Sequence, residues 1–261
     1  MSLESTHTTC KNCQTIFEGK FCPNCAQKAD THRFTVGHFA HEFFHAFTHT
    51  DKGIFFLSKE LLLRPGKVAR EYNSGMRKKY FNPITFLLIV TAIQIFVIKK
   101  TEFFTAFNQS LKTLTEQAAQ SSAESRKQLD QSLKNADKQT SRVTENNKAF
   151  TLLIIPVLSL MTWILFKKSG QNYAENLVFN VLLMSGMTLI FFIIVIPFLI
   201  LPSFVILWML LDYIAIWIYT IIAYKQFYNQ RWPVTIAKGV LMQIVIMISS
   251  FLVAALMEKM F

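Results

Sequence analysis

The sequence has few charged residues and especially few acidic ones. Asp, Glu, Lys and Arg together make up 16% of 261 residues, whereas soluble domains are close to a quarter charged. With 52% hydrophobic residues and 25 Phe, this shortage excludes an ordinary soluble globule. Because 27 Lys and Arg face only 16 Asp and Glu, for a formal charge of +11, the composition indicates a membrane protein with a basic face.

Long apolar segments fill most of the second half of the chain. A helix that crosses the hydrocarbon core needs about 20 apolar residues. Five segments qualify: 82–98, 149–166, 176–201, 203–224 and 234–256. The first opens with Asn82 and Pro83, a pair typical of a helix start. Since lipid leaves backbone groups unsatisfied outside helices and closed barrels, the sequence predicts an all-α, polytopic membrane bundle of five spans over residues 82–261.

Basic residues collect directly before the first predicted span: Arg64, Lys67, Arg70, Arg77, Lys78 and Lys79. The positive-inside rule then places the N-terminus in the cytosol, and five spans place the C-terminus outside. Each cation near an anionic leaflet contributes on the order of 1 kcal/mol, so we expect these six side chains to contact lipid. Nucleic acid is disfavoured as a partner because no base-stacking or groove-reading pattern accompanies the charge.

A polar segment, residues 99–148, separates the first two predicted spans. It contains no Gly or Pro, and small or apolar residues recur at helical spacing in a thin stripe. Either a helical hairpin outside the membrane or a solvated loop fits this pattern.

All four cysteines lie near the N-terminus as two Cys-x-x-Cys pairs: Cys10, Cys13, Cys22 and Cys25. Two such pairs can place four thiolates around one ion, so residues 1–30 predict a small zinc ribbon with one structural Zn²⁺. We expect a tight hairpin around Gly19 between the pairs. Two disulfides or a redox dithiol are the alternatives, and a cytosolic location disfavours the first.

Residues 31–81 predict amphipathic helices at the membrane surface, followed by the basic segment. In the first helix, His41, Glu42 and His45 match H-E-x-x-H, in which two histidines bind zinc and the glutamate activates water. The third ligand of such a site is not evident. A row of solvated or headgroup-facing histidines is the simpler interpretation, so we predict no catalytic residues. Farther along, Pro65-Gly66 is expected to end the second helix.

A few polar residues fall inside the predicted spans: Asp212, Gln243, Lys238 and Gln94. An unpaired carboxylate at that depth costs several kcal/mol, so Asp212 should be protonated or hydrogen-bonded inside the bundle. It could serve a proton or ion pathway, or it could form a helix-to-helix hydrogen bond.

Several motifs together resemble a known family. They are Phe21-Cys22-Pro23-Asn24-Cys25, Arg64-Pro65-Gly66, Glu71-Tyr72, Arg77-Lys78-Lys79-Tyr80-Phe81-Asn82-Pro83 and Tyr173-Ala174-Glu175-Asn176. The chain is similar to a bacterial family of zinc-ribbon-fronted membrane proteins catalogued only as a domain of unknown function. The family usually has Gly where this chain has Ala26. The resemblance implies the zinc, the membrane domain and an inner-membrane location, and it implies no activity.

Three functional hypotheses follow. The first is a non-enzymatic inner-membrane protein whose cytosolic zinc ribbon docks a protein partner or the protein's own helices. The second is a small transporter that uses Asp212, and the third is a membrane zinc metalloprotease that uses His41, Glu42 and His45. The sequence leaves the oligomeric state open.

Overall fold

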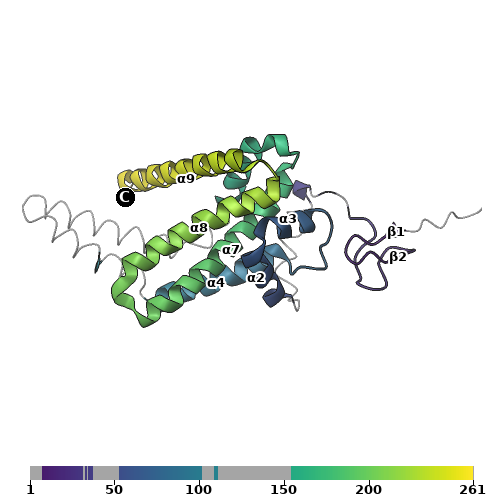
Figure 1. Cartoon of the computed structure of the whole chain (residues 1–261), viewed down its shortest axis with the longest axis horizontal. Helices are drawn as coiled ribbons and strands as arrows, with labels where there is room; N and C mark the ends of the chain where they lie inside the picture. The colour runs from purple at the N-terminus through teal and green to yellow at the C-terminus, as the bar shows by residue number, and fades with distance from the viewer. Residues whose placement is uncertain are drawn as a thin grey trace, which may run out of the picture.

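The computed structural model describes residues 8–31, 33, 35–37, 53–101, 109–110 and 154–260, with the backbone alone at 202 and from 247 to 260. Figure 1 shows a small two-stranded unit at one end of a helical bundle. The strands are β1 (Thr8–Thr9) and β2 (Ile16–Phe17), and they pair antiparallel. We call this side of the bundle the ribbon end; the C-terminus lies at the opposite, far end (Figure 1).

Two short helices and one long helix follow. They are α2 (Ile54–Leu63), α3 (Pro65–Asn73) and α4 (Pro83–Thr101). The predicted start of α4 is confirmed, because Asn82 Oδ1 accepts hydrogen bonds from the backbone N–H groups of Ile84 and Thr85 at 2.9 and 3.2 Å. The expectation that Pro65-Gly66 ends the second amphipathic helix is confirmed, because α2 ends at Leu63; Pro65 then opens α3, since proline suits the first helical position.

The remaining helices run back and forth along the bundle. After a helix over Ile154–Leu165 and the short turn η1 (Lys167–Ser169) come α7 (Tyr173–Ile200), η2 (Pro202–Phe204), α8 (Val205–Tyr228) and α9 (Trp232–Met260). α7 starts at the ribbon end, α8 returns to it, and α9 leaves it again (Figure 1). An asparagine capping box of Asn172 and Glu175 starts α7.

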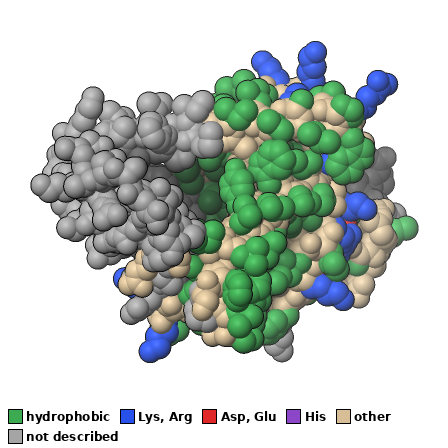
Figure 2. Space-filling model, turned by 60° about the vertical axis from the view of Figure 1, so that its left-hand side comes forward, with side chains coloured by type: hydrophobic (Ala, Val, Ile, Leu, Met, Phe, Trp, Pro, Cys, Tyr) green, Lys and Arg blue, Asp and Glu red, His purple; other side chains and the backbone are tan. Residues whose placement is uncertain are grey.

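Three helices in the described part of the chain are long and apolar enough to cross a membrane: α4, α7 and α8. The described side chains of two other apolar helices cover shorter stretches, Ile154–Leu165 and Trp232–Ile246. Helices therefore occur in all five predicted segments, and three of these helices have the length and apolar composition that a membrane span needs; five spans remain a prediction. Figure 2 shows a face of the molecule dominated by hydrophobic side chains, with Lys and Arg mainly toward its edges.

The core lies where α2 and α3 pack against the bundle. Stacked rings join α8 to α7 and to the turn before η1, with Phe166 against Tyr228 at a 3.9 Å centroid distance and Phe179 against Phe227 at 4.2 Å. α3 lies close to α8 because Gly66 has no side chain; a Cβ there would lie 2.2 Å from the Ala223 carbonyl oxygen. The juxtamembrane helices are thus part of the bundle's packing.

Candidate metal centre and its contacts with the bundle

The two cysteine knuckles have the same backbone geometry. In the first, Cys10 N–H donates to the Thr15 carbonyl and Gln14 N–H donates to the Cys10 carbonyl, both at 2.9 Å. The second repeats this pattern, with Cys22 N–H donating to Gln27 and Ala26 N–H donating to Cys22, both at 2.8 Å. Such turns aim the backbone and both sulfurs of each knuckle toward one point.

The expected hairpin around Gly19 is not the one that forms. The strands pair Thr8 with Phe17 and Thr9 with Ile16, so that the hairpin encloses the first knuckle. Gly19 does have a left-handed φ of 104° and turns the chain between the knuckles. An isolated antiparallel bridge between Phe21 and Lys28 encloses the second knuckle in the same way.

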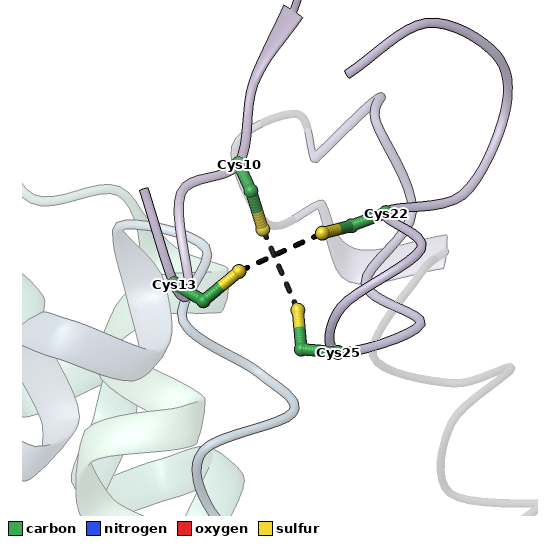
Figure 3. Close-up of side chains that lie close together, drawn as sticks. All are labelled: Cys10, Cys13, Cys22 and Cys25. Atoms are coloured by element: carbon green, nitrogen blue, oxygen red, sulfur yellow. Dashed lines mark hydrogen bonds between the residues drawn. The ribbon is translucent and has the colours of Figure 1, made fainter. Parts of the chain in front are cut away.

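The four cysteine side chains converge on one centre (Figure 3). Their sulfurs all lie within 4.8 Å of one another, with 3.5 Å between Cys10 and Cys25 and 3.6 Å between Cys13 and Cys22. Sulfurs about 2.3 Å from a tetrahedral zinc are separated by roughly 3.8 Å, so the donor set fits such an ion. All four cysteines are free, which rules out the predicted disulfide alternative in this structure.

Burial differs within the cluster. Cys10 and Cys22 are each 2% exposed, whereas Cys13 and Cys25 are partly exposed. A hydrogen bond with the Thr15 side chain lowers the pKa of the Cys13 thiol to about 6, and burial raises the pKa of Cys25 to about 11. A divalent cation would favour the thiolate at all four positions. Four cysteine ligands close the zinc shell, which suits a structural ion and leaves no open position for catalysis.

The ribbon contacts the segment between α3 and α4. The Gln27 side chain is 4% exposed, and its Oε1 accepts a hydrogen bond from the Lys78 backbone N–H at 3.1 Å. Gly75 lies beside Thr31 and Lys11, where a Cβ would be 2.9 Å from Thr31 Oγ1. Because the Gln27 backbone carbonyl also accepts from Cys22, one residue joins the second knuckle directly to the juxtamembrane segment.

A second link ties the linker after the ribbon to the start of α7. Arg33 donates from Nε and Nη2 to the two carboxylate oxygens of Glu175, at 2.5 and 2.6 Å, and from Nη2 to the Gly170 carbonyl. This charged pair raises the pKa of Arg33. Glu175 is 6% exposed and also caps α7, so Arg33 contacts a carboxylate that the helix start already holds in place.

An ionic network surrounds Glu71 on α3. Its Oε2 accepts from Lys79 Nζ at 2.5 Å and from Tyr80 Oη at 2.6 Å, and its Oε1 accepts from Arg64 Nη1 at 3.0 Å; Arg64 also pairs with Glu60. Burial acts to raise the pKa of Glu71, but the hydrogen bonds from Lys79 and Tyr80, with the charges of Lys79 and Arg64, outweigh burial and lower it.

The structure divides the six predicted lipid-contact residues into two groups. Arg64 and Lys79 form the ion pairs with Glu71, and Arg77 is partly buried. Lys67, Arg70 and Lys78 have exposed side chains at the ribbon end. Lipid contact by either group stays a prediction.

The four predicted intramembrane polar residues do not form one cluster in the described part of the chain. Lys238 Nζ donates to Gln230 at the α8–α9 turn, at 3.0 Å. Asp212 Oδ1 is buried and has no hydrogen-bond partner among the described residues. Gln94 and Gln243 are half-buried on α4 and α9. The H-E-x-x-H residues His41, Glu42 and His45 lie outside the described residues, as does most of the insert at 99–148.

Sequence reasoning missed a buried polar network inside the bundle. Asn180 Nδ2 donates to Ser159 Oγ and Thr162 Oγ1 at 3.2 and 3.0 Å, and Tyr228 Oη donates to Asn176 Oδ1 at 2.5 Å. The two asparagines are 2% and 1% exposed. Their spacing of four residues on one apolar helix was the available signal, since buried amides in lipid need partners on neighbouring helices.

Comparison with known proteins supports part of this description. A family model described as a protein of unknown function (DUF3667) matches residues 51–95. No curated protein and no solved structure matches the chain. The matched segment covers α2, α3 and most of α4, including Glu71 and its partners, and ends before the second predicted span. Over residues 51–95, the resemblance to a family catalogued as a domain of unknown function is confirmed.

Proposed function

We propose that this chain is a non-enzymatic inner-membrane protein in which a zinc-bound ribbon assembles on the cytosolic ends of the membrane helices and docks a protein partner. The hydrogen bond from Lys78 N–H to Gln27 Oε1 carries the proposal, because Gln27 also belongs to the second knuckle. Zinc bound at the four cysteines would hold Gln27 in place and so connect the metal to the juxtamembrane segment.

The orientation of the bundle supports a cytosolic ribbon. The ribbon end carries Arg70 and Lys78, the turn after the helix over Ile154–Leu165 with Lys167 and Lys168, and the α8–α9 turn with Arg231. At the far end, the α7–α8 turn over 201–204 has no charged residue. More basic residues on one side favour the cytosolic side for the ribbon. Lys99 and Lys100, at the end of α4, oppose this distribution.

The ribbon also offers an exposed apolar surface to a partner. Ile16 on β2 is 68% exposed and Phe21 is 55% exposed, whereas neighbouring Phe17 is 6% exposed in the cysteine cluster. A small domain needs most of its apolar side chains for its own core, so exposed ones indicate an interface. Exposed aromatic and aliphatic side chains are the usual anchors of protein interfaces. These two residues are the proposed contact surface.

Hydrogen–deuterium exchange of the full chain in mild detergent tests the connection between zinc and the membrane helices. Cys22→Ser should abolish zinc binding and increase exchange at the Lys78 amide. Gln27→Ala should retain one zinc per chain and increase exchange at the same amide. Exchange in the middle of α7 should not change in either variant. If Lys78 exchanges equally in the wild type and in Cys22→Ser, zinc does not hold the ribbon on the bundle.

A pull-down tests the partner. Ile16→Ser/Phe21→Ser should lose a captured protein that the wild type retains, with zinc content unchanged. Capture that is the same for both proteins would remove these residues from the interface.

A further inference from the structure

A cavity at the ribbon end has the features of a site for a phosphate group. It has a volume of about 980 Å³ and lies between the end of the helix over Ile154–Leu165 and the turn from α8 to α9. Its ionisable lining residues are all cations: Lys167 and Lys168 from one wall, Arg231 and Lys238 from the other. From these residues we propose that the cavity binds the phosphodiester headgroup of an anionic lipid.

Among the residues that the structure describes, the four cavity cations have no acidic partner. Within the described residues, the ion pairs are formed by other side chains, and none joins a carboxylate to any of the four cavity cations. Lys167 and Lys168 are adjacent in sequence and exposed, as is Arg231. Like charges gathered around one hollow repel one another, and no described carboxylate offsets this repulsion, so a bound anion would relieve it.

Lys238 is placed for this role by its surroundings. It lies six residues into α9, roughly 9 Å along the helix from Trp232. Its Nζ reaches back to Gln230 Oε1 at 3.0 Å and lies 4.8 Å from the centre of the Phe166 ring. The Gln230 backbone carbonyl accepts a separate hydrogen bond, from Lys225 Nζ. Lys238 thus extends from an apolar helix to the surface, and these contacts hold its ammonium group in place, where it can bind a lipid headgroup.

The chemistry of the walls favours a lipid over a small soluble anion. Next to the basic residues, the cavity is lined by Ile164, Leu165 and Val234. Ile164 and Val234 are 61% and 43% exposed, and Ile164 precedes the two lysines on the side of the membrane span. A hollow lined by both basic and apolar side chains matches a charged headgroup attached to acyl chains. Basic pockets between helices on the cytosolic side bind anionic lipid headgroups in this way. The inference relies on the bilayer orientation of the proposed function.

The test uses the full chain purified in mild detergent. Native mass spectrometry measures binding of phosphatidylglycerol, with zwitterionic phosphatidylcholine as the comparison lipid and inorganic phosphate as the competitor. Lys167→Gln/Lys168→Gln should weaken phosphatidylglycerol binding about 30-fold, as expected for two cations lost from an anionic surface. Lys99→Gln/Lys100→Gln, which neutralises the matched exposed pair at the end of α4, should bind like the wild type.

Three outcomes would overturn the proposal. The two double variants could bind phosphatidylglycerol with equal affinity, the wild type could bind both lipids equally, or inorganic phosphate could displace bound phosphatidylglycerol. The last result would assign the cavity to a free anion. If the 167/168 variant does not fold, Lys238→Gln replaces it, because glutamine keeps an N–H donor for Gln230. Exchange at the Lys78 amide reports on the ribbon independently, so failure of the lipid site and failure of the proposed function are distinguishable.

Discussion

Replacing Gly186 tests how tightly the juxtamembrane helices are built into the bundle. Gly186 lies on α7, opposite Tyr219 of α8, whose Oη donates to the Leu61 carbonyl of α2 at 3.0 Å. A Cβ at position 186 would lie 1.8 Å from Tyr219 Oη and 2.6 Å from Cζ. The ring fills the space that glycine leaves, so Gly186→Ala must displace the tyrosine.

The expected loss has two parts. Overpacking a well-packed site costs about 1–3 kcal/mol. Displacing the hydroxyl leaves the buried Leu61 carbonyl without its partner, at about 1–3 kcal/mol more. Alanine recovers up to about 1 kcal/mol through its higher helix propensity. We therefore expect Gly186→Ala to lower the free energy of unfolding by about 1–5 kcal/mol.

Equilibrium denaturant titration in detergent measures this loss, and a double-mutant cycle identifies its cause. Tyr219→Phe removes the atom nearest to the new methyl group. The double variant should therefore lose less free energy of unfolding than the two single variants together, by about 1 kcal/mol or more. Gly239→Ala is the control, because its Cβ would lie 3.3 Å from Ile221 Cγ1 and 3.9 Å from Tyr224 Cδ2, far looser contacts than at position 186. Wild-type stability of Gly186→Ala, or simple additivity with Tyr219→Phe, would refute the reasoning.

Three further predictions concern single residues. Ala26 has a left-handed φ of 56°, so Ala26→Gly should stabilise the zinc-bound ribbon by up to about 1 kcal/mol, measured as a higher chelator concentration at half-loss of zinc; a lower one would contradict it. Because the pKa of Glu71 is lowered in the folded protein, its carboxylate stabilises the fold at pH values above its unfolded-state pKa, and this stabilisation is lost as the pH falls through the folded-state pKa. Glu71→Gln should therefore make the free energy of unfolding depend less on pH on the acid side. An unchanged pH profile would exclude this role. Asp212→Leu should raise the free energy of unfolding by about 1–3 kcal/mol, because Oδ1 has no partner among the described residues, whereas Asp130→Ala in the insert should have little effect. A fall in the free energy of unfolding for Asp212→Leu would contradict this prediction.

Local features were predictable from sequence because local spacing determines them. Two residues between paired cysteines are enough to bring both sulfurs to one ion, and the four sulfurs do converge. Asn82 and Pro83 define the start of α4 from their own chemistry. The starts and ends of apolar segments likewise located helices to within a few residues.

Contacts between distant segments were not predictable, because no local pattern encodes where the chain returns. Arg33 and Glu175 are 142 residues apart, and nothing near Arg33 identifies its carboxylate. For the same reason Lys67 and Arg64 looked equivalent in the basic segment, although Arg64 is partly buried between two glutamates and Lys67 is exposed. Charge counts predicted a side of the membrane but could not separate cations that form ion pairs within the protein from those available to a ligand.

The strength of the ribbon's attachment decides whether a partner could move it. Among the described residues, the polar contacts that attach the ribbon and its linker are one neutral hydrogen bond at Gln27 and the contacts of Arg33, beside the packing of Thr31 and Lys11 against Gly75. The first contributes about 1 kcal/mol, and Arg33, being 56% exposed, adds a solvent-screened ion pair and one carbonyl contact, about 1–2 kcal/mol more. A total near 3 kcal/mol corresponds to a roughly 100-fold preference for the docked ribbon. Zinc binding to such ribbons is several times stronger, about 10–16 kcal/mol. The ribbon should therefore stay folded when it leaves the bundle, and a partner that prefers the undocked ribbon at Ile16 and Phe21 by more than 100-fold would shift it.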